Sequence, residues 1–413
     1  MSSAPPAAAV PNVAPDVAIR FVLRLARAIH VHGAPAHRLE EVMQRVAPRF
    51  GLTGSFNSTP TSLVAAFGEP PEQRTYLLRI EPGALDLGML PQLDQLVDDL
   101  EHGLVTPEQG NARLDAMDRE PERYGAPLTT LCYGAASAAA ARIFGGGWRE
   151  IAAAGATGLV IGALALSVKR VPALARLFEP LAATLAALIA GAGAALLGQV
   201  SPYVASVAGI IVLLPGLTFT TALTELATRN LVSGTARLSG VTMTFLGLGG
   251  GLALGVAIAA RLWHIDPNPT PVPLPTWTEG LALLISPLAL TVLFRARWQD
   301  AGWILAASVL AFAVARIATR AFGPEIGTFL AAAAVGIATN VYARVLDRLA
   351  AVPLVPSILM LIPGAVGVRS ISSLIQRDVM TGVALGFTLV LVGLSLAAGL
   401  LFASVAVSPK RAL

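Results

Sequence analysis

The sequence is poor in charge and contains a single cysteine. Only 13% of its 413 residues are charged, whereas a soluble domain carries roughly 25%, and 55% are hydrophobic. One cysteine, Cys132, excludes a disulfide framework and a cysteine metal site. The opening Met1–Pro15 is rich in alanine and proline and has no base before Arg20, so we expect a disordered tail over residues 1–15 and no secretory signal.

The sequence also lacks a pattern that joins a nucleophile to a base, and it has no phosphate-binding loop. The glycine-rich stretch Gly247–Gly255 is apolar throughout and is typical of close helix packing. His30, His32 and His37 cluster around Gly33, but no cysteine or acidic partner completes a set of metal ligands. We therefore read these histidines as surface residues, and we expect no enzyme, no cofactor and no metal site.

Charge is divided unevenly along the chain. Residues 1–127 hold sixteen of the 25 acidic and eleven of the 29 basic residues, so the first segment is near −5 and the remainder near +9. The bases of the second part stand between apolar runs, where they set membrane topology, and form no stripe for nucleic acid. This division predicts two parts with different solvents and no nucleic-acid partner.

Residues 16–127 are predicted to form a small soluble α+β domain. Apolar residues recur with a helical period over 16–32, 36–50 and 90–101, and Thr106-Pro107 is typical of a further helix start. Three short stretches between them favour β-strands, namely Leu52–Asn57, Thr61–Phe67 and Thr75–Ile80.

From residue 128 onward the chain reads as a membrane protein. About 20 apolar residues cross a bilayer as a helix, and ten such runs can be marked. They are 128–144, 151–168, 178–198, 203–225, 238–260, 277–294, 301–319, 323–343, 352–374 and 380–407. The Pro-rich linker 266–278 divides them into a first repeat, 128–265, and a second, 279–408.

The bases between the runs favour a cytoplasmic N-terminal domain in the cell inner membrane. Basic residues collect on the cytoplasmic side of membrane proteins. A cytoplasmic N-terminus places eleven of them inside: Lys169, Arg170, Arg176, Arg229, Arg237, Arg295, Arg297, Arg344, Arg348, Lys410 and Arg411. Seven fall outside: Arg142, Arg149, Arg261, Arg316, Arg320, Arg369 and Arg377.

An internal repeat links the two halves of the membrane part. The stretch 211–216 ends in Pro-Gly, as does 359–364, and 226–234 matches 374–382 at the same offset. A block that begins at Phe144 matches a second one at Phe294. Since each unit holds five spans, an odd number, the second copy would enter the membrane from the opposite side. The sequence thus predicts inverted repeats, a design found in many secondary transporters.

Pro215-Gly216 and Pro363-Gly364 lie in the middle of their spans. Proline removes a backbone donor and glycine relaxes the chain, so each helix should break near the midplane. Amide groups freed there could hold a substrate carboxylate, with hydroxyls from Thr218, Thr220 and Thr221 nearby. The alternative is a plain kink, with threonines bonded to their own helix.

Three charged groups near these breaks could carry chemistry. Glu225 is the only carboxylate in its span, and it is a candidate for proton coupling or an interfacial partner of Arg229, four residues on. Arg369 could bind an anionic group or could reach for the interface. Arg229 and its counterparts Arg377 and Asp378 in the second repeat are read as structural pairing residues.

The order of several short motifs resembles the threonine/serine exporter (ThrE) family. They are the stretch from His32-Gly33-Ala34 to Glu40, Leu85-Asp86-Leu87-Gly88, Thr106-Pro107-Glu108, Phe144-Gly145-Gly146 and the Pro-Gly spans. The resemblance covers about 16–407. It implies export of threonine and serine driven by the proton motive force. Two-protein relatives are associated with succinate export, so the resemblance leaves the substrate open.

Three functions remain after this reading. The first is a secondary exporter of small hydroxy amino acids, and the second is the same machine with dicarboxylates as substrate. The third is a membrane-anchored enzyme or sensor whose soluble domain does the work. The expected partners are a small-molecule substrate and the lipid bilayer, and the oligomeric state, including a homo-oligomer, stays open.

Overall fold

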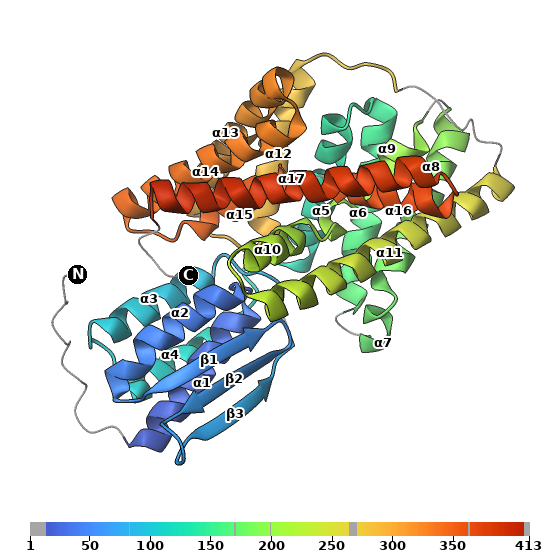
Figure 1. Ribbon diagram of the computed structural model, residues 1–413. Coiled ribbons are helices and arrows are strands. Elements are labelled where there is room, and N and C mark those ends of the chain that lie inside the picture. Colours follow the sequence, from blue (N-terminus) through green and yellow to red (C-terminus); the bar gives the residue numbers. More distant parts are fainter. Residues whose placement is uncertain are drawn as a thin grey trace.

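The computed structural model describes most of the chain and shows an α+β part joined to a larger helical part (Figure 1). The described residues are 14–81, 83–168, 171–198, 200–263, 271–361 and 364–408. Several sequence predictions fall outside these ranges. They concern most of the tail, part of the linker, Lys169, Arg170, Pro363, Lys410 and Arg411.

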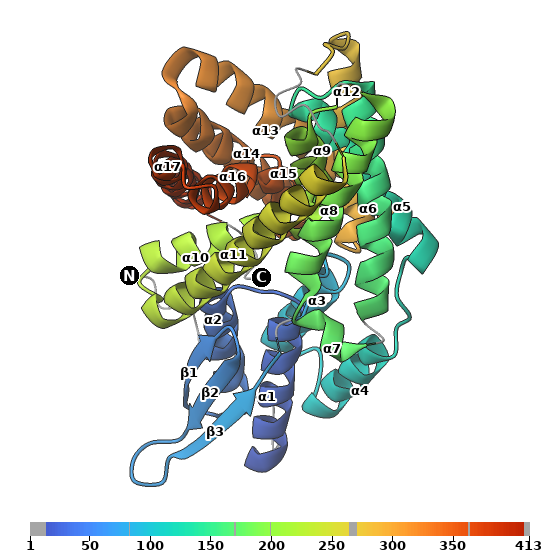
Figure 2. The ribbon, with the colours of Figure 1, turned by 90° about the vertical axis from the view of Figure 1, so that its right-hand side faces the viewer.

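The α+β part contains four α-helices and a three-stranded sheet, close to the predicted pattern. The helices are α1 (Pro15–Val31), α2 (Ala36–Val46), α3 (Leu90–Glu101) and α4 (Pro107–Asp118), with the 3₁₀ turn η1 (Ala47–Phe50) after α2. The strands are β1 (Gly54–Thr59), β2 (Ser62–Phe67) and β3 (Arg74–Arg79), antiparallel in the order β1-β2-β3. The helices gather on one side of this sheet (Figure 2).

Local sequence explains where these helices begin. Thr106 accepts from the Gln109 N–H while the Gln109 side chain accepts from the Thr106 N–H, which is a complete capping box for α4. Ahead of α3, the Asp86 carboxylate accepts from the N–H groups of Gly88 and Met89. The same side chain pairs with Arg295 of the helical part at 3.4 Å, so one motif residue serves both parts.

The core of the α+β part continues into the helical part. Phe21, Leu25 and Met43 are fully buried, and the same cluster includes Ile304 and Val352 from the later helices. Full burial of such a side chain contributes about 1.5–3 kcal/mol. This shared apolar contact holds the two parts together.

One histidine prediction was wrong. His30 is buried, with its ring nitrogens 3.2 Å from Ser58 Oγ and 3.0 Å from the Pro60 carbonyl oxygen. It lies on the inner side of α1, facing the β1–β2 turn, so it is a satisfied core histidine and not a surface one.

The helical part follows the ten predicted apolar runs. Its elements are α5 (Ala126–Ile143), α6 (Trp148–Val168), α7 (Pro172–Ala175), α8 (Phe178–Leu197), α9 (Pro202–Gly209), η2 (Ile211–Leu213), α10 (Gly216–Ala227), α11 (Leu231–Leu262), α12 (Trp277–Leu293), η3 (Trp298–Asp300), α13 (Ala301–Phe322), α14 (Pro324–Leu346), α15 (Ala351–Leu359), α16 (Gly364–Ile375) and α17 (Val379–Ala406).

Length and hydropathy qualify fewer than ten of these runs as membrane spans. Within the described residues, seven helices are long and apolar enough, or eight if the bent pair of α9 and α10 is one span. The apolar helix α12 is shorter, at 17 residues, and α5 is not among the helices that qualify. The chain is therefore a membrane protein, while the count of ten membrane spans rests on the sequence pattern alone.

The two halves of the helical part have matching elements. The series α5, α6, α8, α9–α10 and α11 has the same order of lengths and breaks as α12, α13, α14, α15–α16 and α17. The turns that follow the broken helices adopt the same left-handed backbone, with φ of 67° at Arg229 and 66° at Arg377. In space, α10 packs on α17 and α16 packs on α11, and α11 and α17 run in opposite directions (Figure 1).

Candidate functional site

Both Pro-Gly positions interrupt their helices. In the first half, α9 ends at Gly209, η2 follows, and α10 starts at Gly216 with a bend of 51° between the two arms. Pro215, at φ −78° and ψ 39°, stands directly before α10. In the second half, α15 ends at Leu359 and α16 starts at Gly364. The local cause is the one expected, because proline cannot donate to the preceding turn.

The two interruptions lie against each other. A side chain at Gly364 would place its first carbon 3.1 Å from Cβ of Leu214, just before the first break. Breaks that are more than a hundred residues apart in sequence thus meet in one place. This approach favours glycine, because a larger residue would need Leu214 to give way.

A cavity of about 470 Å³ opens at this meeting point. Its walls come from α5, α10, α12, α15 and the first turns of α11. They include Pro215, Gly216, Thr218 and Gly364. Two loops of the α+β part, at Gly33 and at 83–85, close one side. Arg237 is the one charged residue among the described residues that line it.

A second cavity of about 250 Å³ lies beside α10. It is lined by Thr220 and Thr224 of α10, by residues of α14, α15 and α17, and again by Gly33. Thr221 borders both cavities. The α10 helix therefore separates two hollows, and the α+β part covers both.

Most threonine hydroxyls of α10 are bonded within their own helix. Thr220, Thr221 and Thr224 donate to the carbonyls of Gly216, Leu217 and Thr220 at 3.0–3.1 Å. Their oxygens can still accept a hydrogen bond. Thr218 is exposed on the wall of the cavity of about 470 Å³, and no side chain caps the start of α10, whose first N–H, that of Gly216, donates to the Leu214 carbonyl at 2.8 Å.

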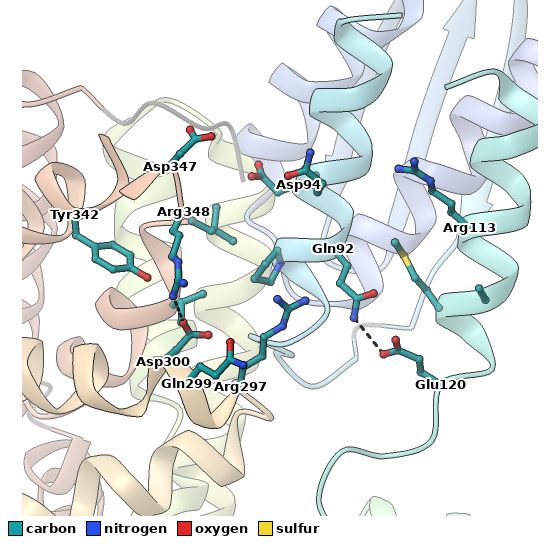
Figure 3. A pocket seen from close by; sticks show the side chains of 16 residues that line it. Gln92, Asp94, Arg113, Glu120, Arg297, Gln299, Asp300, Tyr342, Asp347 and Arg348 are labelled. Atoms are coloured by element: carbon teal, nitrogen blue, oxygen red, sulfur yellow. Dashed lines mark hydrogen bonds and ion pairs between the residues drawn. The ribbon is translucent and has the colours of Figure 1, made fainter. Parts of the chain in front are cut away.

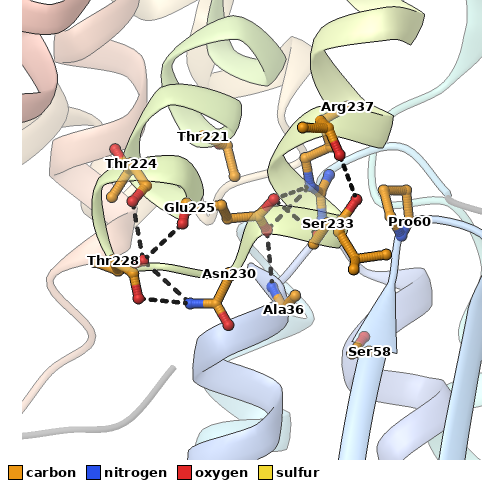
Figure 4. Close-up of polar contacts among 12 residues, drawn as sticks. Ala36, Ser58, Pro60, Thr221, Thr224, Glu225, Thr228, Asn230, Ser233 and Arg237 are labelled. Carbon is orange, nitrogen blue, oxygen red and sulfur yellow. Dashed lines mark hydrogen bonds and ion pairs between the residues drawn. The ribbon is translucent and has the colours of Figure 1, made fainter.

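Glu225 is fully buried at the centre of a polar cluster (Figure 4). Its carboxylate accepts from Arg237 Nε at 3.0 and 3.1 Å and from Ser233 Oγ at 2.8 Å. It also accepts from the backbone N–H of Ala36 at 3.2 Å, at the first turn of α2. This last contact ties α10 to the α+β part by a favourable interaction of a carboxylate with a helix start.

The partner of Glu225 was predicted wrongly. Arg229 is exposed and stands in the left-handed turn between α10 and α11, so its side chain leaves the helix that carries Glu225. Arg237 takes its place from the second turn of α11. Sequence reasoning missed Arg237 because its pairing depends on α11 folding back along α10. The signal available was an arginine inside an otherwise apolar long helix.

The α+β part, next to Glu225, contains two titratable groups whose pKa values are shifted by burial. Burial lowers the pKa of His30, and the hydrogen bond to the Pro60 carbonyl opposes that effect. Burial also raises the pKa of Glu40, while the Ser58 N–H, 2.7 Å away, opposes the shift. Glu40, from the recognised motif near Gly33, thereby anchors β1 to α2.

The second broken helix places its polar residues differently from the prediction. Arg369 is exposed, does not line either cavity, and lies over the Tyr203 ring at 5.4 Å from its centre. Ser370 is buried and donates to the Gly382 carbonyl. Asp378 caps α17 by accepting from the Thr381 N–H, and no ion pair with Arg377 is recorded among the described residues.

A third cavity, of about 490 Å³, lies on the seam between α3–α4 and the loops before α13 and α15 (Figure 3). Its wall is strongly charged. Arg348 pairs with Asp300 at 3.0 Å, and Gln92 donates to Glu120 at 3.1 Å. This cavity shares no lining residue with the central one of about 470 Å³.

Together these features define a helical membrane protein with two interrupted helices that meet at a cavity covered by the α+β part. Residues 20–259 match the ThrE family model and residues 279–406 match the ThrE_2 model, both of which describe threonine/serine exporters. The chain belongs to the threonine/serine exporter family. The resemblance drawn from the sequence is thereby confirmed.

The chain is also similar to fungal proteins called pheromone-regulated membrane protein 10. Identity is 26% to the one from Kluyveromyces lactis, over 94% of this chain and 44% of the relative. It is 28% to the one from Candida albicans, over 86% and 33%, and 25% to the one from Saccharomyces cerevisiae, over 94% and 54%. The chain spans about half the length of these relatives, or less. No solved structure gives a significant match.

Proposed function

We propose that this chain is a secondary transporter that exports small hydroxy amino acids such as threonine and serine, driven by the proton motive force. The observation that carries the proposal is the contact of two broken helices at one cavity of about 470 Å³. Broken backbone inside a bilayer persists where it lines a cavity or is buried in protein. Membership of the exporter family supports the same class.

The two halves would act as inverted repeats. Their reciprocal packing, α10 on α17 and α16 on α11, and the opposite directions of α11 and α17 support a two-fold axis in the membrane plane. Rocking of one repeat against the other around a central site would expose the cavity to each side in turn. Arg237 and Arg295 gather at the end that meets the α+β part, which supports a cytoplasmic position for that domain in the inner membrane.

Glu225 would be the site at which proton binding acts. It is the carboxylate that joins α10, α11 and α2, so a change in its charge would alter all three contacts at once. In the Glu225→Gln variant we expect uphill export driven by a pH gradient to be lost, while exchange without a gradient continues. Asp378→Asn, at an exposed acid of the second repeat, is the matched control. Uphill export by Glu225→Gln would reject the role.

Counterflow in reconstituted vesicles tests the transport function itself. Vesicles loaded with unlabelled threonine should accumulate labelled threonine and serine, and a pH gradient should drive net movement. Succinate and other dicarboxylates form the second arm of the panel. Accumulation of succinate but not threonine would transfer the proposal to dicarboxylates, and no counterflow with any member would overturn it.

A further inference from the structure

We propose that Arg237 binds the carboxylate group of the transported molecule and that Glu225 positions Arg237 for this purpose. The inference rests on the proposed transport function and deepens it by assigning the group that is recognised. The guanidinium of Arg237 then has two sides. Its Nε side, the inner edge, is held by the protein, and its two terminal amino groups, the outer edge, are offered to the substrate.

The inner edge is fully engaged. Arg237 Nε donates to both oxygens of Glu225, at 3.1 and 3.0 Å, and Glu225 is fully buried. Ser233 and the Ala36 N–H hold the same carboxylate from two other directions. Four hydrogen bonds therefore hold the Glu225 carboxylate, and that carboxylate holds Nε of Arg237.

The outer edge faces the cavity. Arg237 lines the hollow of about 470 Å³, and its side chain is 17% exposed. Its hydrogen bonds within the described part of the chain all start from Nε. The two terminal amino groups therefore keep their N–H donors, and a planar pair of such groups matches the two oxygens of a carboxylate.

A second positive feature borders the same cavity. Gly216, Leu217 and Thr218, at the N-terminal end of α10, belong to its wall. The start of a helix carries partial positive charge and unpaired N–H groups, which favour an anionic group. The arginine and the helix start would thus act on the same end of a ligand.

Charge balance favours an amino acid over a dicarboxylate at this place. Glu225 already neutralises Arg237, so the pair has no net charge. An amino acid is a zwitterion and adds none, whereas a dicarboxylate would bring two negative charges close to a buried carboxylate. In a medium of low dielectric constant, like charges at such distances repel strongly. The site therefore fits a ligand with one carboxylate and a compensating ammonium group.

Competition in the counterflow assay tests the carboxylate contact. Unlabelled threonine and threoninamide, which lacks the carboxylate, would compete with labelled threonine. We expect the wild-type protein to prefer threonine by at least about tenfold, as a charge-assisted hydrogen bond implies. Replacement of Arg237 should weaken the binding of threonine at least about tenfold and leave the binding of threoninamide nearly unchanged. The preference for threonine should therefore disappear.

The variants are chosen so that a folding defect cannot imitate this result. Arg237→Gln alone leaves Glu225 buried without its cation, so Glu225→Gln with Arg237→Gln removes both charges together. Arg237→Lys keeps the charge and loses the planar pair of amino groups. It should weaken the binding of threonine less than the double variant does. Arg229→Gln, at an exposed arginine in the turn between α10 and α11, is the control and should keep the wild-type preference.

Two results would overturn the inference. One is a double variant that transports threonine and still prefers it to threoninamide. The other is an equal loss of affinity for both compounds, since that is the mark of a structural role. A wild-type protein that shows no counterflow would instead reject the proposed function, so the two failures are distinguishable.

Discussion

The two interrupted helices carry the same Pro-Gly pair in sequence and differ in what surrounds them. The first, α9–α10, carries threonines on two cavity walls and a buried carboxylate that contacts the α+β part. The second, α15–α16, contributes Gly364 to the cavity and turns Arg369 outward onto Tyr203. The turns that follow them share a left-handed backbone at Arg229 and Arg377, while the polar surroundings differ.

This difference shows how two similar breaks can frame a single polar site. The repeat supplies two breaks that meet, because proline and glycine act on the backbone in either copy. The α+β part packs on Val352 of the second broken helix through apolar contact alone, whereas its Ala36 N–H and Gly33 loop complete the polar surroundings of α10. The predictions below test whether the two copies are unequal in the way described.

The largest effect should come from removing the buried carboxylate of the first copy. Glu225→Ala leaves Arg237 without its partner in a site where its side chain is 17% exposed. Loss of one member of a buried pair costs about 3 kcal/mol or more. We expect a marked fall in the thermal unfolding temperature of the detergent-purified protein. A fall no larger than that of Asp378→Ala, at an exposed helix cap, would show that the buried carboxylate does not stabilise the first copy.

The second largest effect should come from a substitution at the contact between the two breaks. Gly364→Val would insert methyl groups where Cβ of Leu214 is already 3.1 Å from the first added carbon. Overpacking of this kind costs about 1–3 kcal/mol, and we expect slower counterflow as well. Gly280→Val is the control, since its added carbon meets no atom within 4 Å. Equal rates in the two variants would show that the breaks do not need to touch.

The helix cap of the second copy should have a smaller effect. Asp378 accepts from the Thr381 N–H, whereas its counterpart Asn230 makes no such cap bond to α11. Asp378→Ala should cost about 1 kcal/mol, and Asn230→Ala roughly a few tenths. Chemical unfolding of the purified protein would compare them. A larger loss from the Asn230 variant would reverse the assignment of the caps.

The smallest effect concerns acid sensitivity under the first copy. Burial holds the pKa of His30 below the value of about 6.5 that it has when unfolded. Between the pKa of His30 in the folded chain and that in the unfolded chain, the unfolded chain binds more protons. The contribution of His30 to stability is therefore full above pH 6.5 and falls as the pH drops below it. Arg237 adds to the lowering and Glu225 opposes it.

Hydrogen exchange would locate this effect. At pH 5.5 compared with pH 7.5, amides of α1 and β1 beside His30, and of α10 above them, should lose protection relative to α16. The difference should shrink in His30→Gln and persist in the variant of the exposed His102, which is the control. Equal loss in α10 and α16 would show that the acid response does not pass through His30.

Much of the scaffold was predictable because it depends on local chemistry. The helix Leu90–Glu101 was predicted with its observed ends, and the Thr106-Pro107 start is present with its full capping box. The breaks at Pro215-Gly216 and Pro363-Gly364 follow from proline and glycine alone. The site was less predictable: Thr218, Thr221 and Gly364 line the central cavity, while Arg369 does not.

By itself the sequence determined the membrane class and the break at Pro215-Gly216, since hydropathy and backbone restrictions are properties of neighbouring residues. Tertiary structure alone decided which groups meet. Glu225 had a nearby candidate in Arg229, yet the left-handed turn at that residue directs α11 back along α10 and brings Arg237 to the carboxylate. A buried charge takes the partner that the fold brings within hydrogen-bond reach, and spacing along the chain does not reveal which one that is.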